Sequence, residues 1–110
     1  SGKPLRELIY SDDIADACIF FLKKKTKESL INIGTGKEKN IIEYANFIMK
    51  HLGVKLKIIH EKKNMDGTLK KLLDISLAKK YGWRSKTSLE TGLSNTINDF
   101  LKKNLTKKDI

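Results

Sequence analysis

Residues 30–53, LINIGTGKEKNIIEYANFIMKHLG, decide the fold class. The first four residues predict a β-strand, which the turn at Gly34-Thr35-Gly36 ends. Asn40 then offers a helix N-cap, and Glu43 three residues later completes a capping-box pattern. The apolar residues that follow recur at helical spacing: Ile41, Tyr44, Ala45, Ile48 and Leu52. Gly53 can end this helix, and a strand followed by a helix indicates an α/β chain.

The same alternation continues on both sides of this stretch. We expect further strands at residues 5–10 and 54–60. Before residue 30 we expect a helix with Asp12 or Asp13 as its N-cap and this apolar stripe: Ile14, Ala17, Cys18, Phe21 and Leu22.

After residue 60, the tetrapeptide at 64–67 reads as a turn, and two more helices are expected. Ser76 can cap a short helix ending at Tyr81-Gly82, and Thr87 or Ser88 can cap a longer one. The sequence therefore predicts a partial α/β fold of short mixed strands and about four helices over residues 1–104, followed by a frayed Lys-rich tail at 105–110.

The charge of the chain invites a nucleic-acid interpretation that its composition weakens. The net charge is +10, but of the 23 basic residues only Arg6 and Arg84 are arginine. Surfaces that read bases or clamp phosphates use the planar guanidinium fork heavily, so we favour solvated surface lysines. Binding of an anionic small molecule remains open. No apolar window approaches a membrane span and no signal peptide opens the chain, and the single cysteine, Cys18, fits a reducing cytoplasm.

Patterns that would carry catalysis or hold a metal are missing from the sequence. There is no Gly-x-Gly-x-x-Gly, and the turn at 34–36 is better explained as the end of a strand. His51 and His60 have no second ligand at metal-binding spacing; His51 suits the last turn of its helix. Cys18 lies on an expected apolar stripe, which favours core packing, and Asp12, Asp13 and Asp16 are explained by helix capping and the helix dipole.

Two segments resemble the extended short-chain dehydrogenases/reductases. Residues 1–17, SGKPLRELIYSDDIADA, resemble the Arg-Glu-Phe-Ile-Tyr-Val-Asp-Asp-x-Ala segment of those enzymes, and INIGTG at 31–36 is similar to a later strand and turn. A third segment is narrower: DGTLKKLLD at 66–74 resembles the Asp-Gly-Thr-Pro-Arg-Lys-Leu-Leu-Asp motif of GDP-fucose synthases. Gly82-Trp83 and residues 88–93 follow in that family's order, so the resemblance covers roughly residues 1–101.

The resemblance implies an NADP-dependent enzyme that epimerises and reduces GDP-4-keto-6-deoxymannose to GDP-fucose. In that family a Rossmann NADP-binding domain precedes the region present here and carries the catalytic residues, and the full-length enzyme commonly forms a homodimer. We therefore expect no catalytic residue and no bound cofactor in this chain, which alone is expected to be inactive. Cys18, His51 and His60 do not match the family's catalytic positions.

Three substrate-binding positions carry over from the resemblance. Arg6 matches an arginine that contacts the GDP diphosphate, Asp66 matches an acceptor for substrate hydroxyls, and Lys71 matches a lysine near the phosphates. The alternatives are a surface salt bridge of Arg6 to Glu7 or Asp12, a plain Asp-Gly turn at 66–67, and a solvated Lys71.

Two departures from the motif bear on the substrate. Leu69-Lys70 replaces the family's Pro-Arg, and Met65 stands where proline usually precedes the Asp-Gly. Two other functions therefore stay open: another sugar-nucleotide epimerase or dehydratase of the same superfamily, and a stand-alone basic module that binds RNA or another polyanion.

Overall fold

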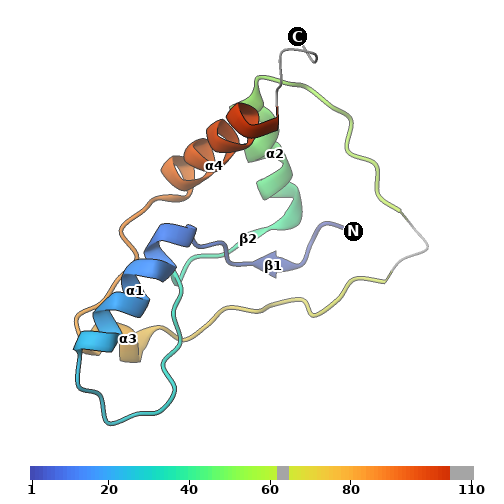
Figure 1. Ribbon diagram of the computed structural model, residues 1–110. Helices are drawn as coiled ribbons and strands as arrows, with labels where there is room; N and C mark the ends of the chain where they lie inside the picture. Colours follow the sequence, from blue (N-terminus) through green and yellow to red (C-terminus); the bar gives the residue numbers. More distant parts are fainter. Residues whose placement is uncertain (62–64, 105–110) are drawn as a thin grey trace.

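The computed structural model describes residues 1–61 and 65–104 (Figure 1). The elements in chain order are β1 (Leu5–Arg6), α1 (Ser11–Lys23), β2 (Lys39–Asn40), α2 (Ile41–Leu52), α3 (Ser76–Lys80) and α4 (Leu89–Asn104). Helices combined with a short sheet confirm the predicted partial α/β fold. The tail predicted at 105–110 and the first residue of the turn predicted at 64–67 lie outside the described residues.

The sheet is small, and β1 is its centre. β1 pairs antiparallel with β2, with Leu5 opposite Asn40 and Arg6 opposite Lys39. On its other side, Leu5 forms a parallel bridge to Lys70, and its backbone N–H donates to the carbonyl of Leu69 at 2.7 Å. Residues 65–75 therefore run back past β1 on their way to α3 (Figure 1).

Helix α2 forms as its sequence predicts. The side chain of Asn40 accepts from the backbone N–H of Glu43 at 2.7 Å, and the carboxylate of Glu43 accepts from the N–H of Asn40 at 2.8 Å. Gly53 ends the helix with φ of 68°, a left-handed conformation that favours glycine. Both caps are local interactions, which is why the sequence alone reveals them.

The predicted caps of the other helices are confirmed in one case and wrong in two. Ser88 precedes α4, and its hydroxyl accepts from the N–H of Thr91 at 3.1 Å. Ser76 is instead the first residue of α3, where its N–H donates to the carboxylate of Asp74 at 2.9 Å. Neither Asp12 nor Asp13 is the N-cap of α1; that position is Tyr10, and its side chain makes no capping bond.

Two predicted strands, at 30–33 and 54–60, do not pair with another strand within the described residues. The third, at 5–10, shortens to Leu5–Arg6. A strand is stabilised by ladder partners that are distant in sequence, and apolar patterning does not reveal whether a partner exists.

The core lies between α1 and α3. It is built from Ala17, Ala78 and Trp83, which are at most 3% exposed, and it is extended by the partly buried Ile9, Phe20, Phe21, Ile31 and Ile33. The two alanines lie at the centre of this cluster, where their small side chains leave room for the Trp83 indole. This cluster holds the C-terminal segment against the first helix.

The predicted stripe of α1 is partly wrong. The buried residues of α1 are Asp13 and Ala17, whereas Ile14 is 44% exposed, Leu22 is 86% exposed, and Cys18 is also exposed. The prediction that Cys18 packs in the core is therefore incorrect. The Asp13–Ala17 face of the helix is buried, and on it the Asp13 carboxylate accepts hydrogen bonds from the backbone N–H groups of Lys86 and Thr87.

The described chain is open and leaves much apolar surface uncovered. Its radius of gyration is 17.3 Å, against roughly 13 Å for a compact domain of this length. Large apolar side chains such as Ile59 and Met65 are 82% and 95% exposed. Within the described residues, none of the helices combines the length and the apolar character that crossing a membrane requires.

Candidate functional site

The pairing of β1 brings two separate parts of the sequence together. Because Leu5 bonds to Leu69 and bridges to Lys70, the neighbouring Arg6 lies beside the segment that begins at Asp66. A Cβ built on Gly67 would lie 3.8 Å from Nη2 of Arg6. Nη2 of the guanidinium therefore lies close to Gly67.

Arg6 is half-buried, and its backbone is well anchored. Its Nη1 donates to the carbonyl of Leu5 at 2.6 Å, and its own carbonyl accepts from the hydroxyl of Tyr44 at 2.9 Å. Burial raises the pKa of Tyr44 above its ordinary value, so the phenol stays a donor at neutral pH. Tyr44 thus ties the first turns of α2 to the strand that carries Arg6.

Asp66 is exposed and lies at the rim of a small cavity. Its carboxylate accepts from the amino group of Ser1 at 2.7 Å and also from the Ser1 hydroxyl. The bond from that amino group, followed by the hydroxyl bond, lowers the pKa of Asp66 below its ordinary value. The cavity, of about 300 Å³, is lined by Ser1, Gly2, Ile41, Ile42, Ala45, Ile58, Ile59, His60, Glu61, Met65 and Asp66.

Lys71 is exposed and follows directly on the bridge at Lys70. Its neighbour Lys70 pairs with Glu38 at 3.1 Å, so this lysine is anchored to the segment before β2. Arg6, Asp66 and Lys71 therefore all lie on β1 or on the segment that runs beside it.

The sequence predicts no role for Glu7 beyond a possible salt bridge to Arg6, but the Glu7 carboxylate has a different environment in the structure. One oxygen, Oε1, accepts from the backbone N–H of Thr35 at 2.6 Å, from the N–H of Gly36 at 2.6 Å and from the Thr35 hydroxyl at 3.0 Å. Glu7 thus fills the glycine turn at 34–36. No motif predicted this contact, because its partners are separated by 28 residues or more.

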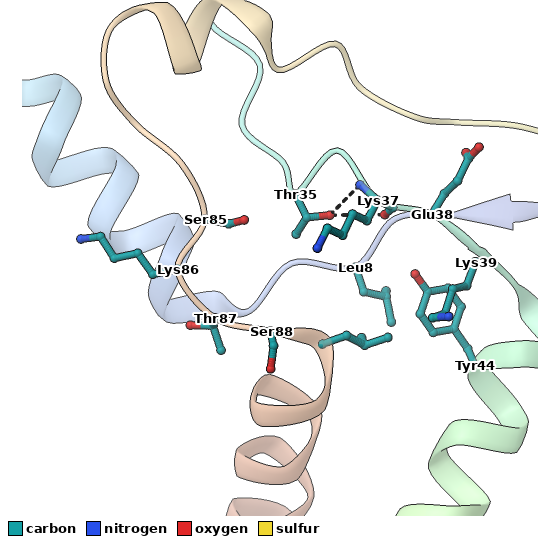
Figure 2. Close-up of a pocket in the computed structure, with 11 residues that line it drawn as sticks. Leu8, Thr35, Lys37, Glu38, Lys39, Tyr44, Ser85, Lys86, Thr87 and Ser88 are labelled. Atoms are coloured by element: carbon teal, nitrogen blue, oxygen red, sulfur yellow. Dashed lines mark hydrogen bonds between the residues drawn. The ribbon is translucent and has the colours of Figure 1, made fainter.

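A larger cavity of about 650 Å³ opens between the segment before α2 and the loop before α4 (Figure 2). It is lined by Leu8, Thr35, Lys37, Glu38, Lys39, Tyr44, Ser85, Lys86, Thr87, Ser88 and Leu89. None of the three predicted substrate-binding residues lines it. Its wall at 85–88 is held by the carboxylates of α1.

Those carboxylates bind the C-terminal segment and do not cap their own helix. Asp13 accepts from the backbone N–H groups of Lys86 and Thr87, and Asp16 accepts from Nε1–H of Trp83 at 2.9 Å. The bond from Trp83, and then the bond from Lys86, lowers the pKa of Asp16 below its ordinary value. The prediction that this acidic cluster serves the start of α1 is corrected for Asp13 and Asp16.

The two histidines, His51 and His60, contact other side chains or line a cavity and do not form a metal site within the described residues. His51 stacks on Phe47, with ring centroids 6.1 Å apart, and His60 lines the small cavity beside Gly2. Among residues 1–61 and 65–104, no three His, Cys, Asp or Glu side chains group in a way that could hold a metal ion.

Comparison with known proteins identifies the relatives of this chain. No family model matches it. It is 42% identical to the GDP-L-fucose synthase of Sinorhizobium fredii over 101 residues, which are 92% of this chain and 32% of that enzyme.

Solved structures agree with the sequence comparison. A GDP-mannoheptose C4 reductase from Campylobacter jejuni, determined with NADP bound, matches with a TM-score of 0.78 and 29% identity over 91% of this chain and 32% of its own. The UDP-glucose 4-epimerase of Thermotoga maritima, determined with UDP-glucose, matches with a TM-score of 0.85 and 29% identity over 94% of this chain and 33% of its own.

The chain thus spans about a third of the length of the relatives it matches. Several of the curated relatives at 36–42% identity carry the same enzyme name. The chain therefore belongs to the GDP-L-fucose synthase family of the extended short-chain dehydrogenases/reductases, and it corresponds to the C-terminal part of those enzymes.

Proposed function

We propose that this chain is the GDP-sugar-binding part of a GDP-L-fucose synthase. The whole enzyme would epimerise GDP-4-keto-6-deoxymannose and reduce it with NADPH to GDP-fucose. The observation that carries the proposal is the position of Arg6 beside Gly67. It brings the motif at residues 1–17 next to the motif at 66–74, in a chain that is 42% identical to such a synthase.

Three residues would bind the substrate. The Arg6 guanidinium can donate two parallel hydrogen bonds to diphosphate oxygens, and Lys71 adds a second positive charge on the adjoining segment. Asp66 would accept from substrate hydroxyls. An exposed aspartate is ionised, and therefore an acceptor only, at neutral pH.

NADPH would be held by residues outside this chain and would supply the hydride. Within the chain, the glycine turn at 34–36 does not fit a dinucleotide pyrophosphate, because the Glu7 carboxylate already accepts from the N–H groups of Thr35 and Gly36. We therefore assign no cofactor contact and no catalytic residue to this chain.

The partner of this chain would be a Rossmann NADP-binding domain of the same enzyme. The open shape and the exposed apolar side chains, including Leu56 at 69% and Ile59 at 82%, support a surface that packs against further protein. A diphosphate-sugar site usually needs both walls of a cleft, so we expect weak ligand affinity from this chain alone. Dimerisation would be a property of the whole enzyme.

A second candidate is an epimerase or dehydratase acting on another nucleotide-sugar. The TM-score of 0.85 to a UDP-glucose 4-epimerase supports it. The departures at Leu69 and Lys70 from the fucose-synthase motif point the same way. Where the alternative substrate is a UDP-sugar, as for that epimerase, the two candidates differ in the base of the nucleotide, and competition between GDP-fucose and UDP-glucose separates them.

Titration of the purified chain with GDP-fucose tests the proposal. We expect Arg6→Ala to weaken binding at least tenfold, which is about 1.4 kcal/mol, whereas Lys102→Ala, an exposed lysine on α4, leaves it unchanged. Equal losses from both variants, together with a steep dependence of affinity on salt, would instead indicate a general polyanion-binding surface.

A further inference from the structure

The environment of Glu7 indicates a role for this residue. Its Oε1 receives three hydrogen bonds from Thr35 and Gly36, two of them at 2.6 Å from backbone N–H groups. Hydrogen bonds to an ionised carboxylate are about twice as strong as neutral ones. The fit around it is close, since a Cβ built on Gly34 would lie 2.7 Å from Oε1.

The position of Glu7 in the chain links this contact to Arg6. Glu7 directly follows Arg6, the last residue of β1, so its bonds to the turn fix the chain one residue beyond the strand. Nη2 of Arg6 lies 3.8 Å from the position that a Cβ on Gly67 would occupy, so the guanidinium lies near the segment at 66–71. The Glu7 bonds thus add to the other contacts that orient β1: its pairing with β2, the bond from Leu5 to Leu69 and the bond from Tyr44 to the Arg6 carbonyl.

We propose that Glu7 is a positioning residue for Arg6: by filling the turn at 34–36, it holds the guanidinium toward the segment at 66–71. Glu7 itself does not touch the nucleotide-sugar. The inference rests on the proposed function, because it assigns Arg6 to the diphosphate. In this proposal, the function of the glycine turn at 34–36 is to bind the Glu7 carboxylate.

Three variants separate this role from a general loss of stability. Glu7→Ala removes the acceptor, Glu7→Gln keeps an acceptor oxygen but removes the charge, and Gly34→Ala displaces the carboxylate from the side of the turn. Glu90→Ala, an exposed glutamate in the first turn of α4, is the matched control. Binding of GDP-fucose to each is followed by NMR, which also reports on the folded state of the chain.

We expect Glu7→Ala and Gly34→Ala to weaken GDP-fucose binding about tenfold, Glu7→Gln to restore part of the loss, and Glu90→Ala to bind as the parent chain does. In an Arg6→Ala background, Glu7→Ala should cause no further loss, since it acts through Arg6. If Glu7→Ala does not fold, GDP-fucose binding by Gly34→Ala and Glu7→Gln tests the positioning role instead.

The outcomes distinguish this inference from the proposed function. If Arg6→Ala weakens binding but Glu7→Ala and Gly34→Ala do not, the positioning role is wrong and the binding role of Arg6 stands. If Glu7→Ala causes the same loss with and without Arg6, Glu7 acts on the fold in general and the positioning role is again overturned. If the parent chain and Arg6→Ala behave alike, the proposed function fails, and this inference fails with it.

Discussion

Oδ2 of Asp13 accepts a hydrogen bond from the backbone N–H of Thr87 at 2.9 Å, across 74 residues of chain. The same oxygen accepts from the N–H of Lys86 at 3.2 Å, and Oδ1 accepts from the Thr87 hydroxyl at 3.0 Å. Asp13 is 5% exposed, so these bonds are shielded from water. The first turn of α1 thereby fixes the segment that leads into α4.

Removing this carboxylate should destabilise the chain markedly. Asp13→Ala leaves the N–H groups of Lys86 and Thr87 without their acceptor, and we expect the free energy of unfolding to fall by about 2 kcal/mol. Urea denaturation followed by circular dichroism measures it. Asp12 is the exposed neighbour in the same turn, and Asp12→Ala should lower the free energy of unfolding by only about 0.5 kcal/mol. If both variants lose the same free energy of unfolding, the stabilisation comes from negative charge near the start of α1 and not from the bonds to residues 86 and 87.

The contact between Trp83 and Asp16 should make the environment of the indole depend on pH. Because the bond from Trp83 lowers the pKa of Asp16, its stabilisation is fully present above the ordinary aspartate value. It is lost as the pH falls below about 4, through the lowered pKa of the folded state. Trp83 is the one tryptophan of the sequence, so its fluorescence reports on this site.

We therefore expect the emission of Trp83 to shift to longer wavelength on acidification from pH 5 to pH 3, at roughly the pKa range of aspartate. Asp16→Asn, whose amide cannot ionise, should flatten the part of the transition that Asp16 contributes. An unchanged acid transition in Asp16→Asn would contradict the assignment.

The centre of the core should not tolerate a larger side chain. Ala17 is 1% exposed and packs with Ala78 and Trp83, so Ala17→Leu should destabilise the chain by about 1–3 kcal/mol through overpacking. Ala15→Leu, on the exposed side of the same helix, should change stability by less than about 0.5 kcal/mol. Thermal denaturation of both variants checks the difference; similar melting temperatures would argue against this core.

The capping box of α2 predicts a third difference in stability. Asn40→Ala removes the acceptor for the N–H of Glu43 and should cost about 1 kcal/mol. Asn46→Ala, in the middle of the same helix and exposed, replaces a weaker helix former with a stronger one and should not destabilise it. The helical signal at 222 nm during denaturation compares the two. A loss of stability in Asn46→Ala as large as that in Asn40→Ala would contradict the capping role.

The features that the sequence predicted correctly are those fixed by nearby residues. The caps of α2 at Asn40 and Gly53 join groups within a few positions of each other, and so does the cap at Ser88. The family could be inferred because its motif residues at 66–74 are contiguous.

Most of the features that it missed depend on distant partners; the cap predicted at Ser76 is an exception, because its N–H bonds to Asp74 only two residues away. Asp13 and Glu7 both take backbone donors far away in the chain, and no local pattern marks such an acceptor. The spacing of the apolar residues at 14, 17, 18, 21 and 22 predicts that Cys18 is buried, whereas the helix buries its Asp13–Ala17 face. The strands expected at 30–33 and 54–60 needed partners that sequence patterning does not supply.

If β1 and the segment at 66–71 bind a GDP-sugar, NMR titration of the isotope-labelled chain will locate the ligand there. We predict that GDP-fucose shifts the amide signals of residues 5–7 and 66–71, and that UDP-glucose at the same concentration shifts them less. Shifts confined to the cavity between 35–39 and 85–89, or spread over the lysine-bearing surface with residues 5–7 unchanged, would contradict the account.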